Sequence, residues 1–467
     1  MKILFIFPKW TSSYGLFGHF ARRSSTWQPL NLALMAAVAQ RAGHTAKIID
    51  AQAENLSNPQ IIKIVKEYRP DLIGMTGTTP FYHLSVALAW EIKAAFYVPI
   101  CIGGPHITIM QEKAFDQCFD YAFLGEAEET FERFLMWLDF PIVFPLYKGI
   151  MYRHKGEVIN TGLADPIAGL DSLPTPARHL LPMHKYKIGT PRGTKKFATI
   201  MTTRGCPFEC VFCNTSLTGH NVRRRSIPNV IKEIMGIIRD FNITHFIFID
   251  DTFTLTRAYA LELCYRLKSL NITFSCSTRA DLVNPYLIKL MAEAGLIRIS
   301  FGLETVDEVI RRNIKKTVPL EAYKTANRLT NEFGIETLNS LMIGLPGETK
   351  QTYEKTMKFL DESKEIKQAN LAIAVPYPGT ELYKMAQAGD YGLRILTHDF
   401  SQYRRYNSAV MESDTLSSQD LLSLQNEGFI RIYSKPWRWL PMLRKNGIIG
   451  LLLMLVRLIK RRGRCMN

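Results

Sequence analysis

The 467-residue sequence predicts an α/β protein with a doubly wound parallel sheet, then a partial (β/α)6 barrel, then a helical C-terminal extension. Short apolar runs alternate with helical patterns over residues 1–137, and the same alternation resumes over 196–385. Strands that alternate with helices form parallel sheets with helices packed on their faces. Between these regions, residues 138–195 lose the alternation and hold seven prolines, which predicts an extended linker. The length fits two or three domains, at roughly 100–200 residues each.

The first sheet is expected to hold five strands, with helical patterns between and after them. Gly43 lies just past the first of these patterns, where a helix commonly stops. The expected strands are 3–7, 46–50, 72–77, 99–104 and 121–126, and the expected helices are 31–42, 61–68, 84–96 and 128–138.

The second sheet is expected to hold six strands, which make a barrel open on one side rather than a closed barrel. The strands are expected near 197–203, 245–250, 272–278, 297–303, 336–343 and 369–375. Helices are expected between them, for example over 228–241, 256–270, 285–294 and 320–333.

The C-terminal region, residues 386–467, is expected to be a helical extension with a basic end. From residue 428 onward it holds ten Lys and Arg and no acidic residue, and it contributes to the net charge of +16. Such a segment attracts anionic lipid or nucleic acid. Its apolar run over 447–459 is shorter than the roughly 20 residues that cross a bilayer. Two interpretations stay open: a helix in the membrane plane with peripheral contact through 435–464, or a helix packed on the barrel.

The cysteines indicate a metal site or catalysis. Three of the eight cysteines fall within eight residues, and the other five are scattered. A disulfide framework would instead pair cysteines along a short secreted chain. The first residues, MKILFIF, are typical of a strand and are followed by no signal-peptidase site, so no signal peptide is expected. We therefore expect a cytoplasmic protein, in which closely spaced cysteines bind metal or react.

The three close cysteines are arranged as Cys206-Pro-Phe-Glu-Cys210-Val-Phe-Cys213, directly after an expected strand. In a barrel of parallel strands, the loops at the carboxyl ends carry the active site. Three thiolates on one loop can bind three irons of a cubane cluster and leave the fourth iron open. The alternative is a structural zinc site, which needs a fourth ligand, and His220 is the nearby candidate.

With this motif in this position, the sequence resembles the radical SAM superfamily. The resemblance implies a [4Fe-4S] cluster held by the three cysteines, whose open iron binds S-adenosylmethionine (SAM). It also implies an electron donor such as flavodoxin or ferredoxin. In that family one electron cleaves SAM and releases a 5'-deoxyadenosyl radical, which takes hydrogen from an unreactive carbon.

The resemblance further implies SAM-binding residues at the ends of successive barrel strands. Phe212 matches the family's aromatic residue beside adenine, and Arg279 is expected to pair with the SAM carboxylate. Polar contacts to the methionine or ribose part are expected from Asp250, Asp251, Ser300 and Glu304, and backbone contacts to adenine from Ile343, Gly344, Pro346 and Gly347.

Each of these residues also has a purely structural interpretation. Asp250 and Asp251 could cap a helix that begins near Thr252. Arg279 could simply pair with Asp281. The glycines and proline of the loop could be turn residues only.

Residues 1–137 resemble the cobalamin-binding domain that precedes many radical SAM barrels. The motifs that carry this resemblance are TGTT, GGPH and GEAEET, which follow expected strands, where open α/β sheets bind ligands. Adjacent glycines would let the backbone approach a corrin or its nucleotide tail. The implied cobalamin-binding residues are Thr76, Thr78, Thr79, Gly103, Gly104, Pro105, Gly125 and Glu126.

The sequence departs from the cobalamin mutases in one respect. It lacks, after the first strand, the Asp-x-His-x-x-Gly motif whose histidine ligates cobalt in those enzymes. His44, His83 and His106 have other contexts, and each is expected to be a surface or loop histidine. Cobalamin would then bind without this protein ligand, as is common among radical SAM fusions. The alternative is a sheet that binds no cobalamin.

These motifs predict a cobalamin-dependent radical SAM enzyme that functionalises an unactivated carbon of a small-molecule substrate, with C-methylation from methylcobalamin as the leading reaction. The alternative within enzymes is a cyclase, or another oxidative or rearranging enzyme, acting on a large apolar porphyrin-like or isoprenoid-like substrate. The tail fits an apolar substrate near the inner face of the membrane. Nucleic acid is not expected as a partner, because no added RNA-binding module is visible. An RNA-modifying protein and a non-enzymatic cofactor carrier are the alternatives of other classes.

Overall fold

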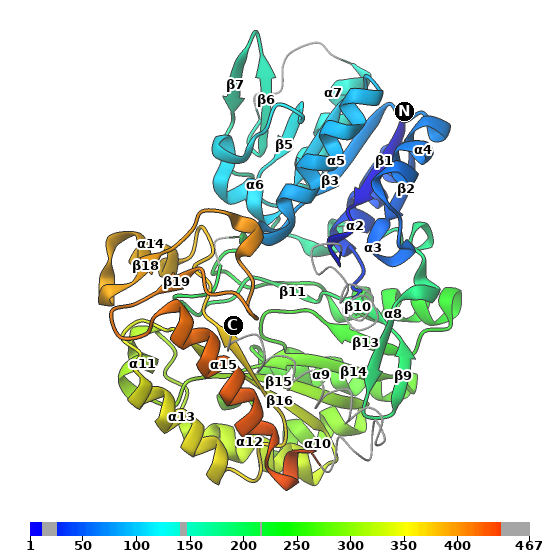
Figure 1. Ribbon diagram of the computed structural model, residues 1–467. Coiled ribbons are helices and arrows are strands. Elements are labelled where there is room, and N and C mark those ends of the chain that lie inside the picture. Colours follow the sequence, from blue (N-terminus) through cyan, green and yellow to red (C-terminus); the bar gives the residue numbers. More distant parts are fainter. Residues whose placement is uncertain (12–25, 141–146, 215–216, 440–467) are drawn as a thin grey trace. The chain divides into compact units, whose positions relative to one another are not determined.

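The computed structural model describes residues 1–11, 26–140, 147–214 and 217–439 (Figure 1). These residues form two compact units. The first is made from Met1–Gly189, Thr194–Pro207 and Thr215–His245, and the second from Thr190–Gly193, Phe208–Asn214 and the chain from Phe246 onward. Most of the segment between the two expected sheets therefore belongs to the first unit.

The first unit contains a seven-stranded sheet in the order β2-β1-β3-β4-β5-β6-β7. Its first five strands pair in parallel, as the sequence predicts. β1 is buried on both faces: Leu4 and Ile6 belong to one core, and the ring of Phe5 packs against Phe131. The strands are β1 Lys2–Phe7, β2 Thr45–Asp50, β3 Leu72–Thr76, β4 Ile100–Gly103, β5 Tyr121–Phe123, β6 Ile150–His154 and β7 Glu157–Asn160.

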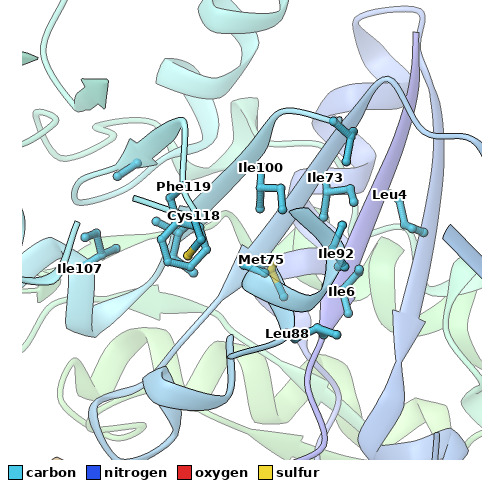
Figure 2. Close-up of a cluster of buried hydrophobic side chains, with 14 of the residues drawn as sticks. Leu4, Ile6, Ile73, Met75, Leu88, Ile92, Ile100, Ile107, Cys118 and Phe119 are labelled. Atoms are coloured by element: carbon cyan, nitrogen blue, oxygen red, sulfur yellow. The ribbon is translucent and has the colours of Figure 1, made fainter. Parts of the chain in front are cut away.

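Helices cover both faces of this sheet. On one face, Ile73, Met75 and Ile100 of the strands share a core with Leu88 and Ile92 of α5 (Figure 2). On the other face, α2 packs against α7. The helices are α2 Leu30–Arg41, α3 Ala51–Glu54, α4 Asn58–Tyr68, α5 Tyr82–Ala95, α6 Pro105–Met110 and α7 Glu128–Asp139.

The expected linker over 138–195 differs from the structure, because two strands of the sheet come from it. β6 pairs antiparallel with β5, and β7 pairs antiparallel with β6. Lys155 and Gly156 join β6 to β7, and both have positive φ, 50° and 87°. Such a two-residue turn matches the twist of a hairpin, so the Lys-Gly pair was the local signal for these strands.

Buried polar contacts tie later segments of the first unit to its sheet. The Tyr186 hydroxyl donates to a carboxylate oxygen of Asp50 over 2.7 Å, at the end of β2. The side-chain oxygen of Gln28 accepts from the amide of Thr199 over 3.0 Å. The elements in this part of the chain are β8 Lys187–Thr190, β9 Gly193–Lys196, β10 Ala198–Ile200, β11 Thr203–Arg204, β12 Arg223–Arg224 and α8 Ile227–Phe241.

A six-stranded sheet in the order β10-β13-β14-β15-β16-β17 confirms the partial barrel. β14 to β17 pair in parallel, and this order leaves β10 and β17 at the two edges. The further strands are β13 His245–Phe248, β14 Thr273–Thr278, β15 Leu296–Glu304, β16 Glu336–Ile343 and β17 Ala369–Ile373. The helices are α9 Arg257–Leu267, α10 Pro285–Glu293, α11 Glu308–Asn313, α12 Leu320–Glu332 and α13 Lys350–Glu362.

The C-terminal extension contains helices and also a short antiparallel ribbon. α15 packs against β17 and α13. The side chain of Arg438 is fully buried, and its guanidinium donates to the carbonyl groups of Leu360, Ile366 and Ile432. The elements of this region are α14 Glu381–Ala388, β18 Arg394–Ile395, β19 Met411–Glu412 and α15 Ser418–Tyr433.

The apolar run over 447–459 and the basic segment from residue 440 to 464 lie outside the described residues. Among the helices that the structure does describe, none is both long and apolar enough to cross a membrane.

Candidate functional site

The start of the cysteine loop is fixed in the first unit. The amide of Cys206 donates to the carbonyl of Gly219 over 3.1 Å, and its side chain is buried. Gly205, which follows β11, has a φ of 99°, and a Cβ there would clash with the carbonyl oxygen of Asn221. Glycine is therefore required directly before the first cysteine.

The rest of the cysteine loop is fixed in the second unit through Val211. Its amide donates to the carbonyl of Ile314 over 3.3 Å, and its carbonyl accepts from the amide of Leu382 over 2.8 Å. The Val211 side chain is buried, whereas Cys210 is half-buried and Cys213 is exposed. The loop backbone is thus held while two thiols stay accessible.

The donor set of the loop suits a cluster better than a zinc ion. The three thiols are free of disulfides, and the nearby cations Arg279 and Lys316 interact with Cys210. Such cations favour the thiolate form that iron binds. His220, the candidate fourth zinc ligand, is exposed. Within the described ranges no group of three His, Cys, Asp or Glu side chains is placed to hold a metal ion, so the ligand assignment stays a prediction.

Arg279, which follows β14, is held by two neighbours. Its guanidinium carbon lies 3.7 Å from the ring centroid of Phe208, and two of its nitrogens contact the Asp281 carboxylate at 3.0 and 2.8 Å. The pairing with Asp281 that the sequence left open is therefore present. Burial lowers the pKa of Arg279, but Asp281 and other neighbours together outweigh this effect and raise the pKa overall, so the guanidinium stays charged.

Glu304, at the end of β15, forms a buried ion pair with Lys316, a residue that the sequence analysis missed. The Lys316 nitrogen lies 2.7 Å from a carboxylate oxygen of Glu304 and 5.8 Å from the ring centroid of Phe212. Two predicted residues, Phe212 and Glu304, are therefore linked through one lysine. Burial lowers the pKa of Lys316, but the Glu304 carboxylate and other neighbours outweigh this effect and raise the pKa overall.

The backbone around Glu304 is irregular. Glu304 has a φ of 60°, in the left-handed region, and the register between β15 and β16 shifts between Gly302 and Glu304. Strained backbone of this kind is common where a side chain is aimed for function. Ser300 lies two positions before Gly302 in β15, between the buried Ile299 and Phe301.

The two aspartates after β13 do not cap a helix. Asp250 is buried and Asp251 is exposed. The next helix, α9, begins at Arg257 with Thr256 at its N-cap, five residues beyond Asp251. The cap interpretation is therefore excluded, and both aspartates lie in the loop at the carboxyl end of a barrel strand.

The loop after β16 is organised by Glu348. Its carboxylate accepts hydrogen bonds from the amides of Gly344 over 2.6 Å and Leu345 over 3.2 Å. Burial raises the pKa of Glu348 to about 7, although these two amides favour the carboxylate. Both amides are already bonded within the protein, so a contact between this loop and adenine has to use its other backbone groups.

The remaining predicted residues of this loop have turn geometry. Gly344 and Gly347 both have a φ of 81°, and the side-chain amide of Asn313 donates to the carbonyl of Pro346 over 2.9 Å. Ile343 is buried at the end of β16, where its carbonyl accepts from the amide of Ala374. The turn interpretation of the glycines is therefore supported.

A cavity of about 200 Å³ lies in the first unit at the carboxyl ends of β3, β4 and β5. Gly104 has a φ of 103°, and a Cβ there would lie 2.8 Å from the Thr76 hydroxyl oxygen. A side chain at this position would therefore crowd the cavity wall. The predicted residues that line the cavity are Thr76, Gly103, Gly104, Gly125 and Glu126.

The cavity also has walls that the sequence analysis missed. Asn31 and Met35 come from α2, Glu128 from α7 and Arg204 from β11. The side-chain amide of Asn31 donates to the Thr76 hydroxyl over 2.9 Å. An amide near the start of α2, followed by a run of apolar residues, was the available signal.

Thr78, Thr79 and Pro105 do not line this cavity. The Thr79 hydroxyl lies 3.3 Å from a ring nitrogen of His106, which is buried in α6. The expectation of a surface or loop histidine is therefore wrong for His106, because the helix turns it into the protein. Burial lowers the pKa of His106 to about 4, so its ring is neutral.

The other two histidines of the first sheet differ from each other. His44 is buried, and one of its ring nitrogens lies 3.3 Å from the N-terminal amine. It lies in the loop before β2, which agrees with the expectation of a surface or loop histidine, but β1 and β2 bring the chain start over its ring. His83 is exposed at the start of α5, as predicted.

Four charged side chains form a buried network beside the cavity. Arg204 contacts Glu126 at 3.1 Å and Glu128 at 2.5 Å, and Arg223 contacts the two oxygens of Glu126 at 2.6 and 2.7 Å. Burial raises the pKa of Glu126, but the two guanidinium groups outweigh it and lower the pKa overall. The Glu126 carboxylate therefore stays ionised.

One oxygen of this network fits a ligand. The Oε2 atom of Glu128 is buried and has no hydrogen-bond partner among the described residues. Buried acceptors are nearly always bonded, so this oxygen suits a ligand that brings N–H donors. The amide side chains of a corrin are such donors, so the residues around this oxygen suit the part of cobalamin that a cavity of this volume can take.

Comparison with known proteins decides the family. Residues 200–360 match the radical SAM superfamily, and residues 19–135 match the B12 binding domain. The uncharacterised methyltransferase PH0819 of Pyrococcus horikoshii is 34% identical over 449 residues, which cover 93% of each chain. The chain belongs to the radical SAM superfamily. It is an enzyme with a B12-binding domain, and its cofactors are a [4Fe-4S] cluster, SAM and cobalamin.

Two further relatives of this radical SAM protein differ in their named reactions. The anaerobic magnesium-protoporphyrin IX monomethyl ester cyclase of Rubrivivax gelatinosus is 28% identical over 93% of this chain and 77% of its own length. The cytidylyl-2-hydroxyethylphosphonate methyltransferase of Streptomyces wedmorensis is 27% identical over 82% of this chain and 81% of its own. Methyl transfer and ring formation both occur among the relatives.

Solved structures confirm the fold. The methyltransferase TsrM from Kitasatospora setae, with cobalamin and a [4Fe-4S] cluster bound, has a TM-score of 0.72 at 15% identity, over 93% of this chain and 88% of its own. OxsB, with aqua-cobalamin and SAM bound, has a TM-score of 0.72 at 17% identity, over 92% of this chain and 65% of its own. The order of a B12-binding domain before a radical SAM domain is thus a known architecture.

Proposed function

We propose that this radical SAM protein transfers a methyl group to an unactivated carbon of a small-molecule substrate. The observation that carries the proposal is the cavity beside Gly104, in a chain that also has the three-cysteine motif. Two relatives that are named as methyltransferases support it.

The cluster is assigned to Cys206, Cys210 and Cys213. When bound, it supplies the electron that cleaves SAM, after reduction by a donor such as flavodoxin or ferredoxin. The backbone bonds at Cys206 and Val211 hold the loop, and none of its three thiols is in a disulfide. The cations near Cys210 stabilise its thiolate.

The SAM site is assigned to the carboxyl ends of the barrel strands. Arg279 offers a fixed positive charge for the SAM carboxylate, because Phe208 and Asp281 hold its guanidinium. Phe212 offers a ring for adenine. The remaining polar and backbone contacts are assigned to Asp250, Asp251, Ser300, Glu304 and the loop of Ile343, Gly344, Pro346 and Gly347.

Cobalamin is assigned to the cavity of the first unit. Its glycine wall admits a flat ligand, and the Glu128 oxygen accepts from an amide. His106 contacts Thr79 and does not line the cavity, so we propose that His106 is not a ligand of cobalt.

The products of SAM test this proposal. Transfer of the SAM methyl group leaves S-adenosylhomocysteine, whereas radical cleavage leaves 5'-deoxyadenosine and methionine. The anaerobically reconstituted protein, supplied with cobalamin, reductant, methyl-labelled SAM and a small-molecule extract, should form both nucleosides and a labelled product. Chromatography with mass spectrometry measures all three, and the Cys210→Ala variant is the control. Formation of 5'-deoxyadenosine without S-adenosylhomocysteine contradicts methyl transfer, and formation of neither contradicts the whole assignment.

Ring formation is the second candidate, because the cyclase of Rubrivivax gelatinosus matches 93% of this chain. The same assay with magnesium-protoporphyrin IX monomethyl ester tests it. A cyclised porphyrin and 5'-deoxyadenosine, with no methyl label in the product, would favour this candidate.

We also propose that the basic segment over 435–464 contacts an anionic lipid surface, which would bring an apolar substrate to the enzyme. Its charge and its apolar run support the proposal. The full chain should co-sediment with vesicles that contain phosphatidylglycerol, and a chain ending at residue 439 should not. Vesicles of phosphatidylcholine alone are the control. Failure of the full chain to bind anionic vesicles contradicts the proposal.

A further inference from the structure

Arg204 lines the cavity that is assigned to cobalamin, and it lies in β11, the strand that directly precedes the cysteine loop. It lines the cavity, and Cys206 follows two residues later. Its side chain is 7% exposed and ion-paired with Glu126 and Glu128. A guanidinium held by two carboxylates has a defined position, so β11, which carries it, is fixed as well.

The chain between Arg204 and Cys206 has little freedom to absorb a movement. β11 and β12 pair antiparallel, with Arg204 opposite Arg223. The one intervening residue, Gly205, is crowded by the Asn221 carbonyl, and the Cys206 amide is bonded to the carbonyl of Gly219. A displacement of Arg204 is therefore passed on to Cys206.

The other end of the network lines the cavity. The two arginines and two glutamates balance in charge, so this edge of the cavity does not attract an anion such as a phosphate. It offers the unbonded Oε2 atom of Glu128, which suits a neutral N–H donor. A corrin amide that donates to this oxygen would restrain Glu128 and, through it, Arg204.

We propose that Arg204 is a positioning residue that links the two cofactors. Cobalamin in the cavity restrains Glu128 and Arg204, and Arg204 holds the Cys206 thiolate where iron binds it. The inference rests on the proposed cobalamin cavity and cluster ligands. Coupling between two binding sites is reciprocal, so the cluster must also raise the affinity of the protein for cobalamin.

The affinity for hydroxocobalamin, measured with and without the reconstituted cluster, tests the linkage. Ultrafiltration under anaerobic conditions separates free cobalamin, which chromatography then quantifies. The cluster-loaded wild-type chain should bind about fivefold more tightly or better, the lower end of typical coupling between sites. In Arg204→Gln the two affinities should become equal. Arg225→Gln is the matched control, because Arg225 pairs with Glu233 in the same unit and neither residue lines the cavity.

The rate of iron loss to a chelator gives a second readout. Hydroxocobalamin should slow iron loss from wild type and from Arg225→Gln, but not from Arg204→Gln. Arg204→Lys keeps the charge with a single donor group and should show a smaller effect, and it replaces Arg204→Gln if that variant does not fold. A merely structural role for Arg204 would change iron loss equally with and without cobalamin.

The outcomes separate this inference from the proposed function. If wild type binds both cofactors but the cluster leaves the cobalamin affinity unchanged, the linkage is overturned while the proposed function stands. If Arg204→Gln keeps the wild-type ratio, Arg204 is not the link. If wild type binds no cobalamin or no cluster, the proposed function itself is contradicted.

Discussion

The ammonium of Lys316 lies 2.7 Å from a carboxylate oxygen of Glu304, and the two side chains are only 11% and 6% exposed. The pair lies at the end of β15, where the backbone of Glu304 has a positive φ. It also places a fixed cation near Phe212 in the cysteine loop. The carboxylate of Glu304, which is predicted to contact SAM, is thus already paired with a cation of the protein.

Removal of Lys316 should destabilise the protein strongly. Lys316→Ala leaves the Glu304 charge buried without its partner, which costs about 3–5 kcal/mol. Lys324→Ala is the control, because Lys324 pairs with Glu321 at the surface, where such pairs contribute roughly 0–1 kcal/mol. Denaturant unfolding of both variants measures the difference, and equal losses would show that the Lys316 pair is solvated.

A methyl group at Gly104 should reduce cobalamin loading. Gly104 has a φ of 103° and a ψ of −178°, a backbone region that is essentially restricted to glycine, and the added Cβ would crowd the Thr76 hydroxyl. Gly43→Ala is the control, since Gly43 also has a positive φ, 87°, and has open space around its Cβ position. Cobalamin bound per chain, together with thermal unfolding, should separate the two variants. Full loading of Gly104→Ala would argue against the cavity as the corrin site.

Alanine at any of the three loop cysteines should abolish the cluster absorbance and SAM cleavage, because two thiolates do not hold the cubane. Cys264→Ala is the control. Its thiol is fully buried in α9, and burial raises its pKa to about 12, so it is not a thiolate ligand. Iron and sulfide content after reconstitution measures the loss. Retention of a full cluster in one loop variant would remove that cysteine from the ligand set.

Stability should fall as pH rises through the titration of Glu348. Burial raises its pKa from 4.5 to about 7, so the folded chain keeps a proton that the unfolded chain releases between these values. The free energy of unfolding should therefore decrease across this window, by up to about 3 kcal/mol. Glu348→Gln keeps an acceptor for the amides of Gly344 and Leu345 but does not titrate. Denaturant unfolding across the window should show a flatter pH dependence for this variant, and an unchanged slope would assign the effect elsewhere.

The sequence predicted the two sheets because their signal is local. Apolar runs and helical patterns alternate within short windows, and the observed strands fall within a few residues of the expected ones. The hairpin of β6 and β7 was missed because the prolines around it were read as a linker. Its pairing with β5 joins segments that are separated by α7, and only the Lys155–Gly156 turn signals it locally.

Site residues that belong to a sequence motif were predictable. Site residues whose role depends on a contact with a residue distant in the sequence were not. Thr76 and Gly104 belong to motifs, and both line the cavity. Lys316 and Arg204 are ordinary basic residues in the sequence, and their importance depends on the carboxylates that the fold brings to them. Glu348 was missed for a related reason, because its raised pKa results from burial, which no residue spacing in the sequence indicates.

The hairpin of β6 and β7 also decides how the first unit can be expressed as a separate fragment. A fragment that ends at residue 137 would leave β5 as a bare edge, open to pairing with the strands of other copies and hence to aggregation. It would also lose the hydrogen bond from the Tyr186 hydroxyl to Asp50 and the hydrogen bond from the Thr199 amide to Gln28. A stable fragment for cobalamin-binding experiments therefore has to extend beyond the proline-rich segment, to the end of α8.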